Sequence, residues 1–229
     1  MEIDGIRFYY LRGNEPQDPR ELGKTREMYE TINKLTGEIA IDVGAHIGSY
    51  ALRMAKRFRR VVAFEPNPFN RHILDLNVQL NKATNVQVED AALSDRDEYS
   101  SFFVHRSADG TGSLNPHHYG FKYDRMIRVK VKRIDSFEFS SIDLLKIDAE
   151  GSELPILMGG ATTIGRTKPI LAIEVHRART PLGSSCNCET CACLRSWNYD
   201  VDIVNEYTVT PVHWIVARPT KSKTKPDHN

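Results

Sequence analysis

The sequence lacks a long apolar run, a strong net charge and scattered cysteines. No apolar stretch approaches the ~20 residues that a helix needs to cross a bilayer, so we expect no membrane partner. With 31 basic and 30 acidic side chains the formal net charge is +1, which favours neither nucleic acid nor an anionic surface as a partner. The first residues, MEIDGIRFYYLRG, include early acids and no apolar core, so they do not indicate a signal peptide. We therefore expect a cytoplasmic location by default.

All four cysteines lie in one octet, CNCETCAC, as Cys186, Cys188, Cys191 and Cys193. Clustered thiols in a chain expected to be cytoplasmic favour metal binding or redox pairing over a disulfide framework. The usual structural zinc site takes two pairs of ligands from separated segments, and the sequence has no second cysteine pair. A zinc site formed by these four residues therefore stays open beside a loop of unpaired or locally bridged thiols.

Short apolar runs alternate with helix-length amphipathic stretches, which predicts βαβ units and a mostly parallel sheet. Asn67 and Pro68 suit the cap and the first position of the second helix. The expected strands of this part are 38–45, 61–65, 86–89, 142–148 and 170–175, and the expected helices are 47–57, 68–82 and one from about 152. The sequence therefore predicts an α/β fold.

Two further segments interrupt this rhythm. Residues 99–105 and 126–133 are expected to pair as antiparallel strands, because apolar and basic residues alternate in the second one. Between them lies the loop ADGTGSLNPHHY, residues 108–119, a candidate lid or acceptor-binding element around Gly112, Ser113, Leu114, His117 and His118, unless it is a plain solvent loop. A short helix near residue 194 and a closing hairpin, 199–204 and 212–217, complete a single domain over 1–218. Residues 1–36 are an N-terminal extension, and 219–229 are expected to be a disordered basic tail.

Acidic residues follow five of the expected strands: Asp42, Glu65, Asp90, Asp148 and Glu174. Ligands of open α/β sheets bind beyond the carboxyl ends of the strands. Five acids at one edge indicate a ligand rich in hydroxyl, amine or cationic groups.

The first of these acids opens the stretch DVGAHIG, whose spacing differs from the G-x-G-x-x-G dinucleotide motif. Gly44 and Gly48 permit a close backbone approach, either to a ligand or merely within a tight turn. Glu65 is placed to accept both hydroxyls of a ribose, and Asp90 to accept the amine of an adenine. A nucleoside with a charged amino-acid tail would satisfy this set.

Five motifs, DVGAHIGSY, FEPNPFN, NVQVEDAALSD, GTGSL and LLKIDAEGSE, resemble in order and spacing the FkbM family of S-adenosylmethionine-dependent methyltransferases. The resemblance covers about residues 37–175. It implies the Rossmann-like class I methyltransferase fold, a seven-stranded sheet with a reversed last strand. His46 stands where the family commonly has Asn, so we expect its contact with the cofactor to differ, and the cysteine octet lies outside the family pattern. The implied cofactor-binding residues are Asp42, Gly44, Ala45, His46 and Gly48 near the methionine end, Glu65 at the ribose, and Asp90 with Ala91 at the adenine.

Methyl transfer to a hydroxyl needs alignment and a base or a metal, because the hydroxyl pKa is high. Asp148, Glu150 and His176 are the candidate catalytic residues. Each has a structural alternative: Glu150 as a helix cap, His176 as a core-edge histidine, and Lys146 with Glu174 as a buried pair. A divalent cation held by Asp148, Glu174 and His176 is a further hypothesis.

The function expected from this resemblance is O-methylation of a hydroxyl on a sugar or another polyhydroxylated small molecule, so the expected partner is a small-molecule or glycan acceptor. N-methylation of an amine or amide is the alternative enzyme reading. A non-catalytic nucleoside-binding module is the alternative outside enzymes. The sequence leaves the oligomeric state open.

Overall fold

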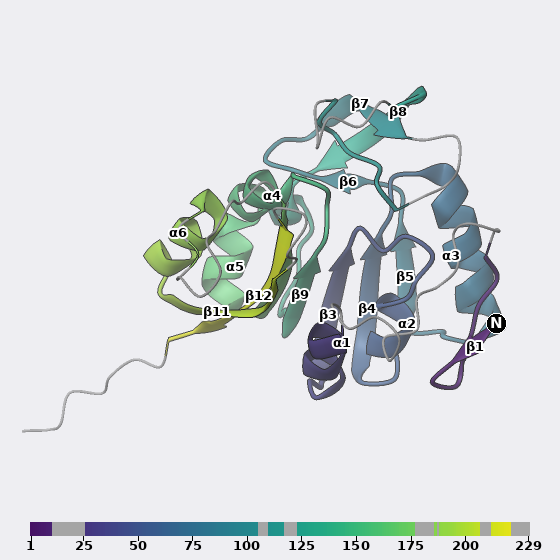
Figure 1. Ribbon diagram of the computed structural model, residues 1–229, viewed down its shortest axis with the longest axis horizontal. Helices are drawn as coiled ribbons and strands as arrows, with labels where there is room; N and C mark the ends of the chain where they lie inside the picture. The colour runs from purple at the N-terminus through teal and green to yellow at the C-terminus, as the bar shows by residue number, and fades with distance from the viewer. Residues whose placement is uncertain are drawn as a thin grey trace, which may run out of the picture.

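The central element of the fold is a seven-stranded sheet, seen here in a computed structural model (Figure 1). The structure describes residues 1–10, 26–104, 110–116, 123–176, 186, 188–206 and 212–220. The strand order is β11-β12-β10-β9-β3-β4-β5, and β12 runs in the direction opposite to the other strands of this sheet. The strands are β3 (Gly37–Val43), β4 (Phe58–Phe64), β5 (Val86–Glu89), β9 (Leu144–Ile147), β10 (Ile170–His176), β11 (Tyr199–Glu206) and β12 (Val212–Pro219). The predicted mostly parallel sheet with a reversed last strand is confirmed.

Helices cover both faces of this sheet (Figure 1). Because side chains alternate along a strand, Ile39 and Ile41 of β3 pack on one face while Ala40 packs on the other. The first face carries α4 (Glu153–Gly159), α5 (Ala161–Thr167) and α6 (Glu189–Ser196), and the second carries α1 (Arg26–Asn33), α2 (Ala51–Met54) and α3 (Pro68–Leu80). Both faces are therefore buried, which explains why the strands read as continuous apolar runs.

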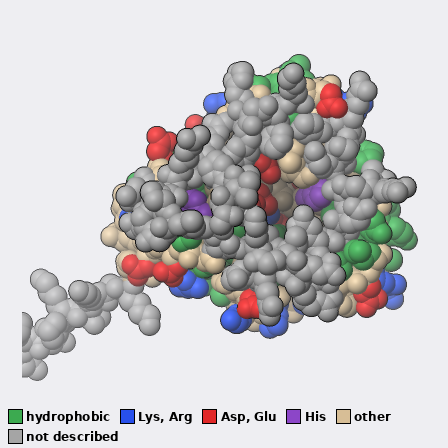
Figure 2. All heavy atoms as spheres, in the orientation of Figure 1, with side chains coloured by type: hydrophobic (Ala, Val, Ile, Leu, Met, Phe, Trp, Pro, Cys, Tyr) green, Lys and Arg blue, Asp and Glu red, His purple; other side chains and the backbone are tan. Residues whose placement is uncertain are grey.

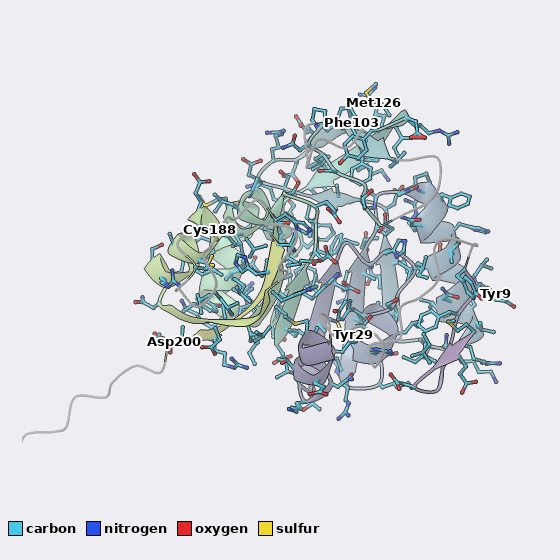
Figure 3. All side chains as sticks on the ribbon, viewed as in Figure 1. Tyr9, Tyr29, Phe103, Met126, Cys188 and Asp200 are labelled. Atoms are coloured by element: carbon cyan, nitrogen blue, oxygen red, sulfur yellow. The ribbon has the colours of Figure 1, made fainter. Side chains whose placement is uncertain are left out.

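A smaller sheet lies above the carboxyl ends of the central strands (Figure 1). Its order is β6-β8-β7, formed by β6 (Ala92–Leu93), β7 (Glu98–Val104) and β8 (Arg125–Lys132), and it is followed by the 3-10 helix η2 (Ile134–Ser136). The expected antiparallel pairing of β7 with β8 is confirmed; Phe103 and Met126 are register partners near its outer end (Figure 3). Val129 and Val131 are buried while Arg128, Lys130 and Lys132, which alternate with them, are exposed, as the alternation predicts.

The N-terminal residues, which the sequence left without elements, pack against α2 and α3. The hairpin β1 (Glu2–Ile3) and β2 (Ile6–Arg7) buries Ile3 and Ile6 against Leu52 of α2. The side chain of Asn77 in α3 is fully buried and donates to two carbonyls, that of Ile47 at 2.8 Å and that of Tyr9 at 3.1 Å. This amide therefore joins the first ten residues to the turn that follows β3.

Two predicted helices are shorter in the structure. The expected helix 47–57 is only α2, because Gly48 has φ +98° and residues 46–50 form turns instead. The helix expected from residue 152 is broken into α4 and α5; a Cβ on Gly159 would lie 1.9 Å from the carbonyl oxygen of Ser94, so this glycine marks a close approach. The predicted cap of α3 is confirmed, since Asn67 accepts a hydrogen bond from the backbone N–H of Phe69 at 3.1 Å.

The tail was expected to begin at Pro219, and this boundary is wrong. Pro219 is the last residue of β12 and lies opposite Tyr199, and Thr220 donates its N–H to the carbonyl of Asn198 at 2.9 Å. The remaining residues, 221–229, lie outside the described part. In the part that the structure describes, no helix combines the length and the apolarity that crossing a bilayer requires.

Candidate active site

A cavity of about 370 Å³ lies at the carboxyl edge of the central sheet, beneath the smaller sheet. Its size falls within the roughly 300–1,000 Å³ typical of small-molecule sites. Figure 2 shows acidic and histidine side chains around a hollow in the face drawn there. The elements that line it are the ends of β3, β4, β9 and β10, the segment 91–93 after β5, and the segment 110–114 of the lid candidate. The strand edge predicted to bind a ligand is therefore hollow.

Gly44 shapes the floor of this cavity. It has φ +73°, and a Cβ there would lie 1.8 Å from the carbonyl oxygen of Asp148. Its N–H and that of Ala45 both donate to the carbonyl of Phe64, at 3.1 and 3.0 Å. A side chain would therefore push the end of β3 away from the loop after β9. Gly48 does not line the cavity, but a Cβ there would meet the Leu74 side chain at 2.7 Å, so it shapes the same turn.

Glu65 presents a buried carboxylate to the cavity at the end of β4. Its two oxygens accept the backbone N–H groups of His46 at 2.8 Å and Asn67 at 2.9 Å. Burial raises the pKa of Glu65 to about 7, against the opposing effect of these two donors. Each oxygen keeps further acceptor capacity, so this carboxylate suits a ligand with paired hydroxyls.

His46 has φ +52°, a left-handed conformation that few residues with a side chain adopt. Asn and His are among the residue types enriched there. The backbone at this position thus explains why His replaces the Asn that the sequence comparison led us to expect. His46 lines the cavity, and its ring lies near Gly110 of the lid candidate.

Asp42 lies behind the cavity wall and forms a buried ion pair. Its Oδ1 is 3.0 Å from Nζ of Lys146, and both side chains are almost fully buried. Lys146 also donates to the carbonyls of Val43 and Gly44 at 3.3 and 3.1 Å, and lies 3.7 Å from Asp148. Burial alone would lower the pKa of Lys146, but the carboxylates of Asp42 and Asp148 raise it. The ion pair therefore holds the turn at Gly44.

The buried Lys146–Glu174 pair, which the sequence offered as a structural alternative, is therefore wrong: Lys146 forms its ion pairs with Asp42 and with Asp148. Asp90 is also held away from the cavity. Its carboxylate is half exposed and pairs with Arg71 at 2.6 Å and Lys130 at 3.6 Å, whereas its neighbour Ala91 lines the cavity.

Acidic side chains and one histidine gather at the ends of β9 and β10. One ligand atom each of Asp148, Glu174 and His176 lie within 4.8 Å of one another. Burial and the neighbouring Asp148 raise the pKa of Glu174 well above its ordinary value. Asp148, Glu150 and Glu174 line the cavity, while His176 lies just behind them. The structure therefore brings the three candidate catalytic residues together.

His176 is held between two other carboxylates. Its Nδ1 lies 2.8 Å from Glu153 and its Nε2 lies 3.5 Å from Glu150. Burial alone would lower the pKa of His176, but the hydrogen bond and charge of Glu153 raise it to about 10. The imidazole is therefore charged at neutral pH. The sequence missed Glu153, whose only signal was an acid in the first turn of a predicted helix.

The motif GTGSL forms part of the cavity wall. Ser113 is fully buried, and two backbone hydrogen bonds of 2.9 and 3.0 Å join it to Phe103 of β7. Its hydroxyl donates to the carbonyl of Glu150 at 2.7 Å. Gly112 lies so close to Phe102 that a Cβ would approach the ring to 2.5 Å. The smaller sheet is thus tied to the loop after β9. His117 and His118, the other residues of this lid candidate, lie outside the described residues.

Comparison with known proteins identifies the family. A sequence model described as the methyltransferase FkbM domain matches residues 42–201, more than half of the chain. The chain belongs to the FkbM methyltransferase family. It is therefore an enzyme, and the alternative of a non-catalytic binding module is not supported. Family membership also implies S-adenosylmethionine as the methyl donor.

Named relatives of this FkbM methyltransferase are distant. Methyltransferase sdnD of Sordaria araneosa is 25% identical over 192 residues, which cover 69% of this chain and 74% of the relative. Methyltransferase 1 of Beauveria bassiana is 24% identical over 141 residues, covering 52% and 57%. The solved structure of Methyltransferase FkbM from Methylobacillus flagellatus has a TM-score of 0.56 at 18% identity; it covers 80% of this chain, which spans only 43% of that protein.

A precorrin-6y C5,15-methyltransferase from Geobacter metallireducens has a TM-score of 0.52 at 14% identity, covering 92% of this chain and 94% of that one. At such identities the solved structures show a shared fold. They say nothing of the acceptor of this FkbM methyltransferase.

The cavity of this FkbM methyltransferase also has an aromatic wall that the sequence did not predict. Tyr29 of α1 stacks on Tyr50 with ring centroids 4.4 Å apart, and Tyr50 lies 5.9 Å from Trp214 of β12. All three line the cavity, and Nζ of Lys146 lies 5.0 Å from the Tyr50 ring centroid. These residues come from the two ends of the chain, so no local motif could have grouped them.

Proposed function

We propose that this enzyme transfers the methyl group of S-adenosylmethionine to a hydroxyl of a sugar or another polyhydroxylated small molecule. The observation that carries this proposal is the pair of neighbouring carboxylates, Asp148 and Glu174, at the edge of the cavity. A hydroxyl must lose a proton during methyl transfer, so it needs a base within reach. A neutral amine has a free lone pair and would need no such pair of acids.

The residues of the cavity fit the cofactor. When bound, S-adenosylmethionine supplies a methyl group on a positively charged sulfur, which needs little further activation. In our proposal Glu65 accepts the ribose hydroxyls, and the cavity floor at Gly44 and His46 receives the amino-acid end. Ala45 is buried between them and acts through the shape of this turn. Ala91 contacts the adenine.

Asp42, Gly48 and Asp90 take indirect roles in this proposal. Asp42 acts through Lys146 and Gly48 through the turn, since neither lines the cavity. Asp90 is engaged by Arg71, so we assign the adenine contact to the neighbouring backbone instead of to this carboxylate.

The proton of the acceptor goes to Asp148 in this mechanism. Burial and the neighbouring Asp148 raise the pKa of Glu174, which favours its protonated form; in that form it donates a hydrogen bond to Asp148 and leaves that carboxylate as the acceptor. His176 is a positioning residue: its charge holds Glu150 and Glu153 in place, and it carries no free site for a proton near neutral pH.

The test is a screen of hydroxylated and amino acceptors with methyl-labelled S-adenosylmethionine, followed by mass spectrometry of the product. We expect O-methylated products, and a loss of about 10²- to 10⁴-fold in kcat for Asp148→Asn with cofactor binding intact by calorimetry. Asp202→Asn is the matched control. Asp202 lies on the edge strand β11, is 66% exposed and pairs with Arg218 of β12. Transfer to amines alone, or full activity of Asp148→Asn, would contradict the proposal.

A divalent cation is a second candidate for activating the hydroxyl. It is favoured by the grouping of Asp148, Glu174 and His176, whose oxygen and nitrogen ligands suit such ions. A cation there would have to displace the proton of His176. Activity that is lost on treatment with a chelator and returns with Mg²⁺ or Mn²⁺ would support this route over direct proton transfer to Asp148.

A further inference from the structure

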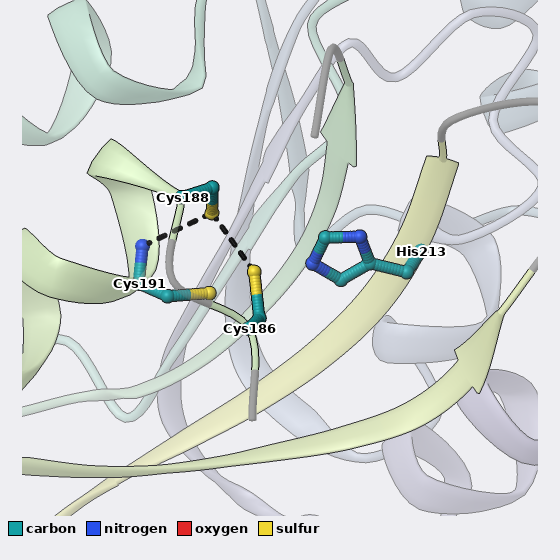
Figure 4. Close-up of side chains that lie close together, drawn as sticks. All are labelled: Cys186, Cys188, Cys191 and His213. Carbon is teal, nitrogen blue, oxygen red and sulfur yellow. Dashed lines mark hydrogen bonds between the residues drawn. The ribbon is translucent and has the colours of Figure 1, made fainter. Parts of the chain in front are cut away.

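Three of the four cysteines converge on a histidine from another segment (Figure 4). Cys186, Cys188 and Cys191 lie with His213 so that one ligand atom of each falls within 4.8 Å of all the others. Cys188 caps α6, Cys191 lies in its first turn, and His213 is the second residue of β12. Cys193 is half-buried on α6 and lies outside this group. The missing second ligand segment is therefore β12, and it contributes a histidine.

Burial makes this group unlike a chance surface cluster. Cys186 and Cys191 are fully buried and His213 is 3% exposed. Nε2 of His213 is buried, and no described residue satisfies it with a standard hydrogen bond. In Figure 4 a ring nitrogen of His213 faces the sulfur of Cys186. A buried imidazole nitrogen directed at cysteine sulfur is the arrangement that a shared metal ion would use.

The distances suit a single small ion. The sulfurs of Cys186 and Cys188 are 3.1 Å apart, too far for a disulfide, and none of the four cysteines is disulfide-bonded. A tetrahedral zinc site with Zn–S bonds of about 2.3 Å has ligand atoms about 3.8 Å apart. The ligand atoms of this group lie at most 4.8 Å from one another, so small movements of the side chains would bring them to the spacing of a tetrahedral zinc site.

The residues around the cysteines supply hydrogen-bond donors and a positive charge, which three thiolates need. The backbone N–H of Cys191 points at the sulfur of Cys188 at 3.4 Å, and Arg195 donates to the carbonyl of Cys186 at 2.6 Å. Three thiolates outweigh the two charges of Zn²⁺ by one, and the guanidinium of Arg195 offsets that excess. Such outer contacts orient the ligands of metal sites.

We propose that Cys186, Cys188, Cys191 and His213 form a structural zinc site with three sulfur ligands and one nitrogen ligand. Soft thiolates select zinc over magnesium or calcium, and four protein ligands leave no open position for catalysis. The site joins the start of α6 to the reversed strand. Because Val175 is the register partner of His213, the site lies beside the strand that ends at His176.

The proposed zinc site would stabilise the position of α6. α6 has only eight residues, too few to be stable by itself, and the chain reaches it from the end of β10. Zinc at this position would hold α6 against the sheet next to the acceptor side of the cavity. It acts on the shape of that wall and takes no part in methyl transfer.

The test measures zinc per chain by mass spectrometry and the spectrum of the cobalt-substituted enzyme, both under reducing conditions. We expect one zinc per chain in the wild type and in Cys193→Ser, the matched control, and thiolate-to-cobalt and tetrahedral cobalt bands in both. Cys191→Ser and His213→Ala should lose the metal. His213→Cys should regain it with a cobalt spectrum shifted towards four sulfur ligands.

A second measurement covers variants that do not fold. In the zinc-loaded wild type only Cys193 should react with an alkylating reagent, and all four thiols should react after chelation. Wild-type enzyme without zinc or cobalt bands, four reactive thiols before chelation, or loss of metal in Cys193→Ser would each overturn the proposal. These readouts are independent of methyl transfer, so failure of the proposed function would leave them unchanged.

Discussion

The buried ion pair of Asp42 and Lys146 provides the sharpest test of how this site is built. Both side chains are at most 1% exposed, and Nζ lies 3.0 Å from Oδ1. Replacing Lys146 with Met keeps most of the volume but leaves Asp42 buried without its cation. Removing one partner of such a pair costs about 3–5 kcal/mol. That is a large part of the free energy of unfolding of most domains, which is about 5–15 kcal/mol.

Urea denaturation of Lys146→Met at neutral pH checks this magnitude. Lys130→Met is the matched control, because the Lys130 side chain is 48% exposed and pairs with Asp90 at 3.6 Å; its loss should cost about 0–1 kcal/mol. The double variant Asp42→Asn, Lys146→Met should recover most of the stability, since no charge is then buried alone.

The penalty should also depend on pH. Burial already raises the pKa of Asp42, and without the cation its folded form binds a proton more readily than the unfolded chain does. The variant should therefore gain stability relative to wild type as the pH falls towards the ordinary range of Asp, and lose it as the pH rises. A cost below about 1 kcal/mol, or a cost that is independent of pH, would refute the reasoning.

Three further predictions concern the cavity wall. Gly44→Ala should lose at least about 1–2 kcal/mol of stability from its left-handed backbone and lose cofactor binding by calorimetry, whereas Gly165→Ala, with open space around its Cβ in α5, should be neutral or stabilising. The pKa of His176 is raised to about 10, so its contribution to stability should be complete below pH 6.5 and lost as the pH rises through 10. In Glu153→Gln the free energy of unfolding, measured by denaturation at a series of pH values, should fall less steeply with pH. Equal slopes in the variant and the wild type would contradict the ion pair. Ser113→Ala removes one hydrogen bond, so it should cost about 1 kcal/mol and raise the acceptor KM more than it lowers kcat; an unchanged KM would separate the lid from acceptor binding.

The sequence predicts well what local pattern determines. The apolar runs of β3 and β4 gave the strands, and the residues that end them, Gly44 and Glu65, line the cavity. The carboxyl ends of parallel strands must meet at one edge, so the position of these side chains follows from topology alone. Asn67 could likewise be read as a cap from its neighbour Pro68.

The sequence could not predict partners that depend on register. Lys146 lies opposite Asp42 on β3 and opposite Ala172 on β10, two residues before Glu174. A shift of two residues would have produced the Lys146–Glu174 pair instead. Asp90 shows the same limit: Arg71, from the preceding helix, captures a carboxylate that the strand order alone would send to the cavity.

The cysteine group needed the direction of a strand as well. His213 reaches the cysteines because β12 runs backwards, so that its first residues lie beside the last residues of β10. Nothing in the spacing of the octet indicates that a histidine twenty residues after Cys193 would lie beside it. In the proposed zinc site a histidine from a strand takes the place of Cys193, which the sequence groups with the other three cysteines.

The hydrogen bond between Ser113 and Glu150 has a consequence for how relatives of this enzyme can diverge. The cavity wall at residues 110–114 and the loop that carries Glu150 share one hydroxyl, so exchanging either segment alone by recombination would break this hydrogen bond unless the new segment restored it. A chimaera that imported residues 110–116 from another enzyme would inherit its donor's specificity only if that segment also brought a group able to reach the same carbonyl.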